Sequence, residues 1–313
     1  MFATSLELHG VIVPLLTPFD TRGNIDGDAL RRFVGQLRAC GVGGVMSCGT
    51  TGEGPLLTKE ERQRVTEVVV EAIAGSISVI AQVGAISTRE TIALALHART
   101  VGTDAIAVVA PYFYHCSDTM LHEHYLQVCN AVPDMPVYLY NIPQRTGNAL
   151  TPALVGEIAA RCPNMVGIKD SAGDLAVTVE MRGVRESTFR VIMGSDGLIL
   201  PALTMGVSAS VSGNANVFPE LFVTLFDAFQ RGDYTSARAA QERINVVRHI
   251  LRDGGDLALF KAVVARRGVA LGGVRPPLLD VSSATVDECV RALATAGIMI
   301  DAFAATSSLP VGD

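Results

Sequence analysis

The amino-acid sequence predicts an α/β protein and, within that class, a closed (β/α)8 barrel, or TIM barrel, with a C-terminal helical appendage. Three observations lead to this prediction. Short apolar runs alternate with amphipathic stretches almost from the start of the chain, and eight such pairs can be counted. The length of 313 residues also accommodates a barrel of about 250 residues with a small addition.

Each expected strand is a run of apolar and β-branched residues bounded by polar, glycine or proline positions. In chain order, these runs cover residues 11–15, 44–48, 78–82, 105–109, 136–140, 165–169, 190–193 and 208–212.

The stretches between the runs have helical patterns, several of which begin with a Ser, Thr or Asp suited to an N-cap. They begin near residues 28, 58, 87, 118, 151, 175, 198 and 219. Further helical stretches over residues 234–251, 257–267 and 285–296 follow the eighth pair. We therefore divide the chain into a barrel over residues 1–232 and a C-terminal helical region over residues 233–313.

An open, doubly wound sheet is the rival architecture. Its first strand usually leads through a glycine-rich turn straight into a helix. Here the first run is followed by LLTPFDTRGN, which lacks that turn. The barrel is therefore the preferred prediction.

Composition limits the partners. Hydrophobic residues make up 49% of the chain and charged residues only 18%, so much apolar surface must be buried internally or between subunits, and we expect an oligomer. The net charge of −6, with scattered Lys and Arg, argues against nucleic acid. No apolar run reaches the roughly 18 residues needed to span a bilayer, and a signal-peptide pattern is missing. We expect no membrane partner and a cytoplasmic location.

Lys169 is the strongest candidate for catalysis, because barrel enzymes carry catalytic groups at the carboxyl ends of their strands. It ends the apolar run MVGIK. Burial disfavours the charged ammonium and so favours the neutral amine, which is the nucleophile in Schiff-base chemistry. A structural lysine that pairs with Asp170, or extends to the rim, is the alternative.

Tyr140 ends the preceding expected strand, VYLY. Neighbouring strands lie about 4.8 Å apart, so inward side chains at two adjacent strand ends share one pocket. A phenol beside Lys169 can transfer protons to and from an imine intermediate. A tyrosine that only caps the barrel core is the alternative.

The motif GTTGE after the second strand offers a site for a carboxylate. Gly49 lets the backbone approach a ligand closely, and Thr50 and Thr51 add two hydroxyls to successive N–H groups. Glu53 is expected to hold this loop by accepting backbone bonds, and a tight capped turn is the structural alternative. Arg145, in the loop after Tyr140, offers a bidentate donor for a second carboxylate or a surface ion pair.

Neither a metal nor another cofactor is expected. His115, His122 and His124 do not share the face of a helix, and no carboxylate–histidine set has ligand spacing. The six cysteines contain no CxxC pair of the kind used for zinc or redox chemistry.

The segments GTTGEGP, YNIPQRTG, GIKDSAGD and GNANVFPE, in this order, resemble the dihydrodipicolinate synthase and N-acetylneuraminate lyase family. The resemblance implies that Lys169 forms a Schiff base with pyruvate and that Tyr140 donates and accepts protons. It further implies that Thr50 and Thr51 bind the pyruvate carboxylate and that Val211 contacts pyruvate.

The resemblance extends over residues 10–296 and implies a homotetramer, often a dimer of dimers. Arg145 resembles the synthase branch, whose arginine binds the carboxylate of aspartate semialdehyde, and argues against sialic-acid lyases. Phe113 is a departure, because synthases place there a proton-relaying tyrosine supplied across a subunit interface. Tyr112 or Tyr114 would have to replace it. Ile86 stands where lysine-inhibited synthases usually carry asparagine, so no lysine inhibition is expected.

The leading interpretation is a dihydrodipicolinate synthase-like Schiff-base C–C lyase or synthase that forms or consumes pyruvate. Its second substrate would be a carboxylate-bearing aldehyde or 2-oxo acid. One alternative is a Schiff-base dehydratase or deaminase of a 2-oxo sugar acid or a hydroxyproline-derived compound, which uses the same imine. The other is a non-catalytic 2-oxo acid sensor, although binding alone would not require an imine.

Overall fold

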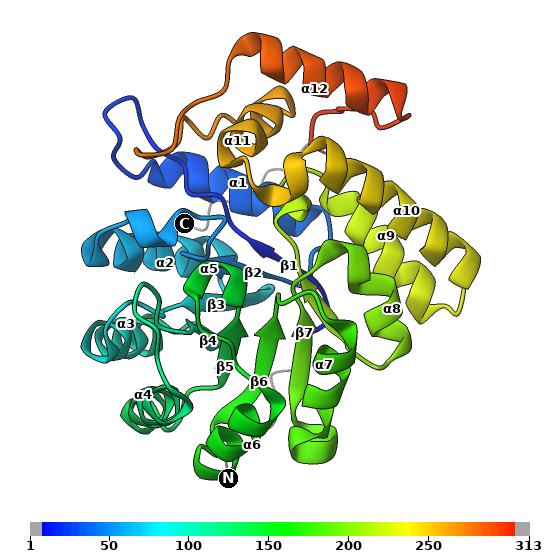
Figure 1. Ribbon diagram of the computed structural model, residues 1–313. Coiled ribbons are helices and arrows are strands. Elements are labelled where there is room, and N and C mark those ends of the chain that lie inside the picture. Colours follow the sequence, from blue (N-terminus) through cyan, green and yellow to red (C-terminus); the bar gives the residue numbers. More distant parts are fainter. Residues whose placement is uncertain (1–7, 304–313) are drawn as a thin grey trace.

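The computed structural model describes residues 8–303, which fold into a closed barrel of eight parallel strands (Figure 1). The strands pair in chain order, and the last strand returns to pair with the first. Helices surround the barrel and further helices follow it. The predicted (β/α)8 barrel with C-terminal helices is therefore confirmed.

All eight strands lie where the sequence predicts them, with ends displaced by at most one residue. Their bounds are β1 Gly10–Pro14, β2 Gly44–Ser47, β3 Ser78–Gln82, β4 Ala105–Val109, β5 Val137–Asn141, β6 Met165–Asp170, β7 Arg190–Met193 and β8 Ala209–Val211.

The helices that connect the strands begin at polar caps, as expected. Thr58 and Glu61 form a reciprocal capping box, and Ser87, Ser117 and Thr151 accept bonds from the N–H groups of their first turns. The connecting helices are α1 Gly27–Ala39, α2 Lys59–Ile73, α3 Thr88–Val101, α4 Asp118–Ala131, α6 Pro152–Arg161, α7 Leu175–Glu180, α8 Ile199–Thr204 and α9 Pro219–Gln230.

Several short elements were not foreseen. A one-turn helix, α5 (Pro143–Thr146), follows β5, and short 3-10 segments lie at other strand ends and after α7. The 3-10 segments are η1 Gly54–Leu56, η2 Met181–Thr188, η3 Asp196–Leu198, η4 Asn214–Asn216 and η5 Arg252–Gly254. Most of them lie at the carboxyl ends of the strands, where they shape the loops around the barrel mouth.

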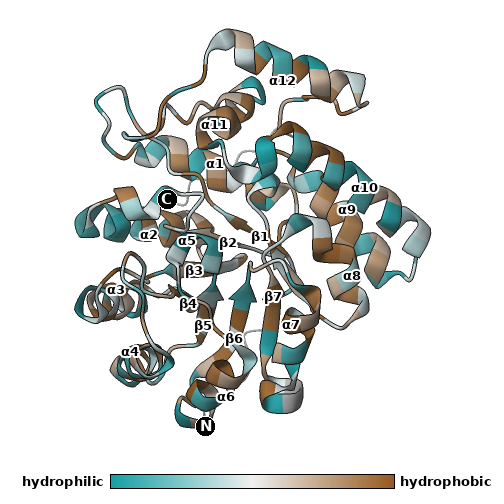
Figure 2. Cartoon of the chain, viewed as in Figure 1, coloured by the Kyte–Doolittle hydropathy of each residue, from teal (hydrophilic) through white to brown (hydrophobic). Residues whose placement is uncertain are grey.

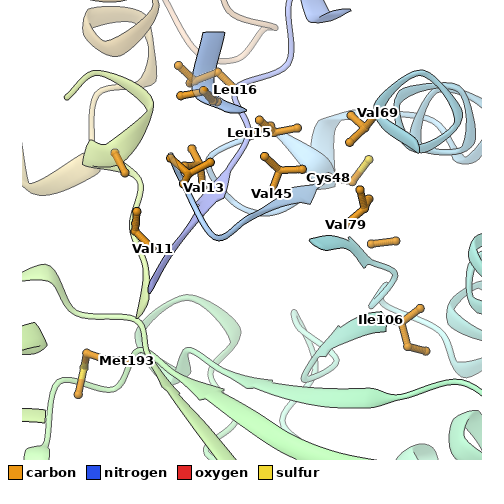
Figure 3. Close-up of a cluster of buried hydrophobic side chains, with 14 of the residues drawn as sticks. Val11, Val13, Leu15, Leu16, Val45, Cys48, Val69, Val79, Ile106 and Met193 are labelled. Carbon is orange, nitrogen blue, oxygen red and sulfur yellow. The ribbon is translucent and has the colours of Figure 1, made fainter. Parts of the chain in front are cut away.

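Alternation along the strands produces two apolar cores. Val11 and Val13 point outward and pack, with residues such as Val45 and Val79, against the helices (Figure 3). Ile12 lies between them in sequence and points into the barrel. The inner core also contains Leu8, Met46, Ile80, Ala105, Ala107, Tyr138, Ile192, Ala209 and Val211.

The C-terminal region consists of α10 (Tyr234–Ile250), α11 (Leu257–Arg266) and α12 (Ser283–Thr295). Figure 1 shows α10 beside α9, and α11 and α12 near α1 at one side of the barrel. Arg267, at the end of α11, is buried and ion-pairs with Glu220 on α9 at 2.5 Å.

The strands are mostly hydrophobic, whereas the surrounding helices combine hydrophobic and hydrophilic faces (Figure 2). Within residues 8–303, no helix is both long enough and apolar enough to cross a membrane.

Candidate active site

A cavity of about 370 Å³ opens at the carboxyl ends of the strands. Turns after β2, β5, β6, β7 and β8 contribute to its wall, together with α10 and η5 of the C-terminal region. The lining residues are Pro14, Thr50, Thr51, Tyr140, Ile142, Gln144, Arg145, Lys169, Ser171, Gly194, Ser195, Asp196, Val211, Gly213, Asn214, Arg248, Asp253 and Gly254.

Lys169 and Tyr140 form the floor of this cavity. They are direct register partners on β6 and β5, so their inward side chains meet. The Nζ atom of Lys169 lies 3.8 Å from the centroid of the Tyr140 ring. The two residues are only 5% and 2% exposed, so the amine and the phenol meet in a site largely closed to water.

Gly167 lies on β6 one inward-facing position before Lys169, and its lack of a side chain leaves space for the Tyr138 ring. A Cβ atom at this position would lie 2.1 Å from the carbonyl oxygen of Arg190 and 2.7 Å from the Tyr138 ring. Only glycine allows that close approach. The Tyr138 ring therefore fills the barrel interior directly beneath the Lys169 layer.

The carboxylate of Asp170 does not serve as the counter-ion expected for a merely structural lysine. One of its oxygens accepts bonds from Asn141 Nδ2 at 2.8 Å and the Ala172 N–H at 3.1 Å. The other accepts a bond from Thr178 Oγ1 at 2.6 Å. Asp170 thus braces the β5 and β6 ends from outside the cavity.

The Tyr140 hydroxyl is placed for proton transfer. It lies 3.3 Å from Thr50 Oγ1, within hydrogen-bond distance. Burial raises the pKa of Tyr140, but the nearby charge of Lys169, hydrogen bonds from Thr50 and Lys169, and the charge of Arg145 outweigh burial. The net effect lowers the pKa of Tyr140 below its ordinary value of about 10.

The GTTGE turn brings Thr50 and Thr51 to the cavity wall, whereas Gly49 lies behind them and is not among the lining residues. A Cβ atom at Gly213, after β8, would lie 3.3 Å from Thr51 Oγ1. The turns after β2 and β8 therefore pack closely beside each other. Val211, at the end of β8, adds an apolar surface to the cavity.

Arg145 lies on α5 at the rim, with an exposed side chain. It lines the cavity and is close enough to Tyr140 to influence its pKa. The alternative was a surface ion pair, but no carboxylate among the described side chains, which exclude those of residues 186 and 187, pairs with Arg145. The guanidinium is therefore free to meet an anionic ligand.

The part of the cavity wall formed by Asp196 and Arg248 was not predicted from the sequence. Asp196 accepts bonds from Ser212 Oγ at 2.8 Å and Asn214 Nδ2 at 2.6 Å, and burial raises the pKa of its carboxyl group. Arg248 of α10 ion-pairs with Asp253 at 3.1 Å. No local pattern in the sequence could indicate that α10 reaches the barrel mouth.

The three aromatic residues after β4 lie in different environments. Phe113 is 83% exposed with a left-handed φ of 79°, and Tyr114 is 68% exposed. Tyr112 is half-buried against the cluster of Val109, Tyr140 and Ile142. None of the three aromatic residues is among the cavity-lining residues of the described chain.

The histidines singled out in the sequence are not brought together. His124 is buried, its Nδ1 lies 2.9 Å from Thr88 Oγ1, and burial lowers its pKa to about 4. Across the described ranges, no group of three or more His, Cys, Asp or Glu side chains is arranged to hold a metal ion.

A parallel barrel with a buried lysine and tyrosine on adjacent strand ends defines an enzyme-like site suited to imine chemistry. The model of the dihydrodipicolinate synthetase family matches residues 7–296. The chain belongs to this family. That membership supports a pyruvate-dependent Schiff-base lyase of the dihydrodipicolinate synthase type.

Individual relatives agree with the family match. The chain is 42% identical to an uncharacterized DapA-like lyase of Halobacterium salinarum, covering 87% of this chain and 89% of that protein. It is 36% identical to the 4-hydroxy-tetrahydrodipicolinate synthase of Methanopyrus kandleri, with coverage of 94% and 98%. The crystal structure of YagE, an E. coli K12 family member in complex with pyruvate, superposes with a TM-score of 0.89 at 28% identity. That match covers 94% of this chain and all of YagE.

Proposed function

We propose that this chain is a Schiff-base lyase or synthase in which Lys169 attacks the C2 carbonyl of pyruvate or a related 2-oxo acid. The observation that carries the proposal is the buried contact between Lys169 Nζ and the Tyr140 ring at 3.8 Å, with Thr50 beside the phenol. An amine and a proton-transfer group in one closed site are what imine formation requires.

The chemical steps follow from this arrangement. The Lys169 amine adds to C2 and forms a carbinolamine, and Tyr140 donates a proton to the departing hydroxyl so that water leaves and an imine forms. Loss of a proton from C3 converts the imine into an enamine. C3 then bonds to the aldehyde carbon of the second substrate, whose oxygen takes up a proton. Reversal of this step cleaves the same C–C bond, and water finally releases the product from Lys169.

The remaining groups would position the 2-oxo acid. Thr50 and Thr51, with the backbone N–H groups of their turn, would bind its carboxylate, and Thr50 would also exchange protons with Tyr140. Gly49 would let the backbone approach the ligand. Val211 would contact the methyl group of pyruvate.

Arg145 would bind a carboxylate on the second substrate, because its exposed guanidinium lines the cavity and has no acidic partner among the described side chains. This role of Arg145 favours a dihydrodipicolinate synthase-like reaction with a carboxylate-bearing aldehyde. A 2-oxo acid with a second carboxylate would fit equally well.

A Schiff-base dehydratase or deaminase is the second candidate. It is favoured by Phe113, which replaces the expected tyrosine, and by the wall of Ser195 and Asp196, which offers hydroxyl-binding groups. Such an enzyme would release water or ammonia without breaking a C–C bond.

We also propose that the chain assembles into a homotetramer, as a dimer of dimers. Large hydrophobic side chains remain exposed on the isolated chain, and their burial between copies would remove apolar surface from water. They include Ile86, Phe113, Tyr114 and Met120.

A panel of substrates tests the proposed reaction. Pyruvate with aspartate semialdehyde, N-acetylneuraminate and 2-keto-3-deoxygluconate would each be assayed for pyruvate consumption or release. We expect turnover that requires Lys169. Release of water or ammonia without pyruvate would favour the second candidate, and no Lys169-dependent reaction with any 2-oxo acid would contradict both.

A further inference from the structure

A buried ion pair lies beneath the GTTGE turn, outside the cavity. Lys261 Nζ, from α11, is 2.7 Å from Glu53 Oε1, and the two side chains are 1% and 0% exposed. Neither residue is among those that line the cavity. The pair therefore connects the turn that carries Thr50 and Thr51 to the C-terminal helical region.

Both partners are tied to the segment that follows α11. The second carboxylate oxygen of Glu53 accepts a bond from the Arg275 N–H at 2.7 Å. Lys261 Nζ donates to the carbonyl oxygen of Gly273 at 2.7 Å and lies 4.2 Å from the centroid of the Phe19 ring. The pair is thus held in one geometry by fixed neighbours on both sides.

The turn above the pair is tightly wound and contains an unfavourable conformation. Glu53 has a left-handed φ of 57°, which is uncommon for a residue with a Cβ atom. The Gly52 and Gly54 N–H groups both donate to the Gly49 carbonyl, at 3.1 and 3.0 Å. A residue stays in such a region only when its surroundings hold it there, and the Glu53 side chain supplies that hold.

A buried ion pair is weak support for stability, because removing two charges from water offsets most of their attraction. A role in fixing one conformation explains its presence better. We propose that Glu53 and Lys261 are positioning residues that hold Thr50 and Thr51 in the conformation that binds the pyruvate carboxylate. This inference rests on the proposed function, since it assigns that carboxylate to the turn.

The contacts within the cavity depend on the position of the GTTGE turn. Thr50 Oγ1 and the Tyr140 hydroxyl lie 3.3 Å apart, near the upper limit of a hydrogen bond, so a small movement of the turn breaks the contact. Phe260, next to Lys261 on α11, also packs beside Gly213, which lies next to Thr51. A Cβ atom at Gly213 would lie 3.6 Å from its ring.

The test compares two substitutions near the same helix. Lys261→Met removes the charge beneath the turn, whereas Arg267→Met removes the buried arginine that pairs with Glu220 away from the cavity. Pyruvate trapping by borohydride is measured against pyruvate concentration, and Tm is measured for each variant.

We expect both variants to lose thermal stability. Only Lys261→Met should raise the half-saturating pyruvate concentration, by about 10- to 100-fold, because misplacement of a binding group by about 1 Å has effects of this order. The maximal trapping rate should fall by a smaller factor than the affinity, because Lys169 and Tyr140 remain in place and only the Thr50–Tyr140 contact is disturbed.

The double variant Glu53→Gln/Lys261→Met separates positioning from stability. It removes both charges, so Tm should recover relative to Lys261→Met while the half-saturating concentration stays raised. If Lys261→Met does not fold, Glu53→Gln alone replaces it in the comparison with Arg267→Met. Recovery of pyruvate affinity along with Tm, or an unchanged half-saturating concentration in the single variant, would overturn the positioning role. Failure of the unmodified protein to be trapped would instead refute the proposed function.

Discussion

The floor and the rim of the cavity are built differently. Lys169 and Tyr140 form the floor on two hydrogen-bonded strands and are almost fully buried. Arg145 and Arg248 lie at the rim on helices, and the Arg248 side chain is 42% exposed. Strand register fixes the floor, whereas the rim depends on a one-turn helix and on the packing of α10.

This difference indicates that the floor and the rim have separate functions. A rigid, dry floor suits imine formation, which needs an amine and a proton donor at fixed distance. Residues of an exposed rim, carried by a one-turn helix and by a helix of the C-terminal region, can be substituted without disturbing the barrel. We therefore expect substitutions in the floor to affect every reaction of the 2-oxo acid and those at the rim to affect only the second substrate.

The largest effect is expected at the floor. Tyr140→Phe keeps the ring and its contact with Lys169 but removes the hydroxyl, so turnover should fall by about 10²- to 10⁴-fold. Steady-state kinetics with the best substrate of the panel measures the loss. Tyr112→Phe is the matched control, because Tyr112 packs against the same cluster without lining the cavity. An equal loss in the control would show that proton transfer is not confined to the floor.

A smaller and more selective effect is expected at the rim. Arg145→Ala removes a charge-assisted contact of about 1.5–3 kcal/mol, which corresponds to roughly 10- to 100-fold in kcat/KM for a carboxylate-bearing second substrate. Pyruvate trapping should be nearly unchanged. If trapping and turnover fell together, Arg145 would also act on pyruvate. The proposed separation between floor and rim would then be wrong.

The electrostatic coupling within the floor can be measured by titration. In the unmodified protein, one tyrosine should ionise below the ordinary pKa of about 10, and this step should vanish in Tyr140→Phe. Lys169→Met removes the positive charge that favours tyrosinate, while burial continues to disfavour it, so the pKa of Tyr140 should rise. Tyrosinate absorbance reports the shift. A step that does not move in Lys169→Met would contradict the contact between the two side chains.

The smallest effect is expected at Phe113, beyond the rim. Phe113→Tyr adds one hydroxyl to a side chain that is 83% exposed on the single chain, so the free energy of unfolding of that chain should hardly change. Activity with aspartate semialdehyde should rise several-fold, of the order that weak general acid catalysis allows. Efficient use of aspartate semialdehyde by the unmodified protein would show that the second tyrosine is dispensable.

Much of the floor could be predicted from the sequence. Apolar alternation located the strands, and parallel order then placed the ends of β5 and β6 side by side, so Tyr140 and Lys169 were expected to meet. Their catalytic roles stay predictions, because geometry alone does not demonstrate turnover.

The rest of the site depends on contacts between distant segments. Arg248 and Asp253 reach the cavity only because α10 packs against α9 and η3. Glu53 was expected to accept backbone bonds, and Arg275 supplies one, but its ion pair with Lys261 has no local signal. Tertiary packing, which sequence periodicity does not specify, determines these parts.

The most direct test of imine chemistry is to identify the residue that pyruvate modifies. The protein is reduced with borohydride in the presence of pyruvate, with and without a metal chelator, and the labelled peptide is mapped by mass spectrometry. We predict one label per chain on Lys169, unaffected by chelator and lost in Lys169→Ala. A label on another residue, or trapping that persists in Lys169→Ala, would contradict the proposed mechanism.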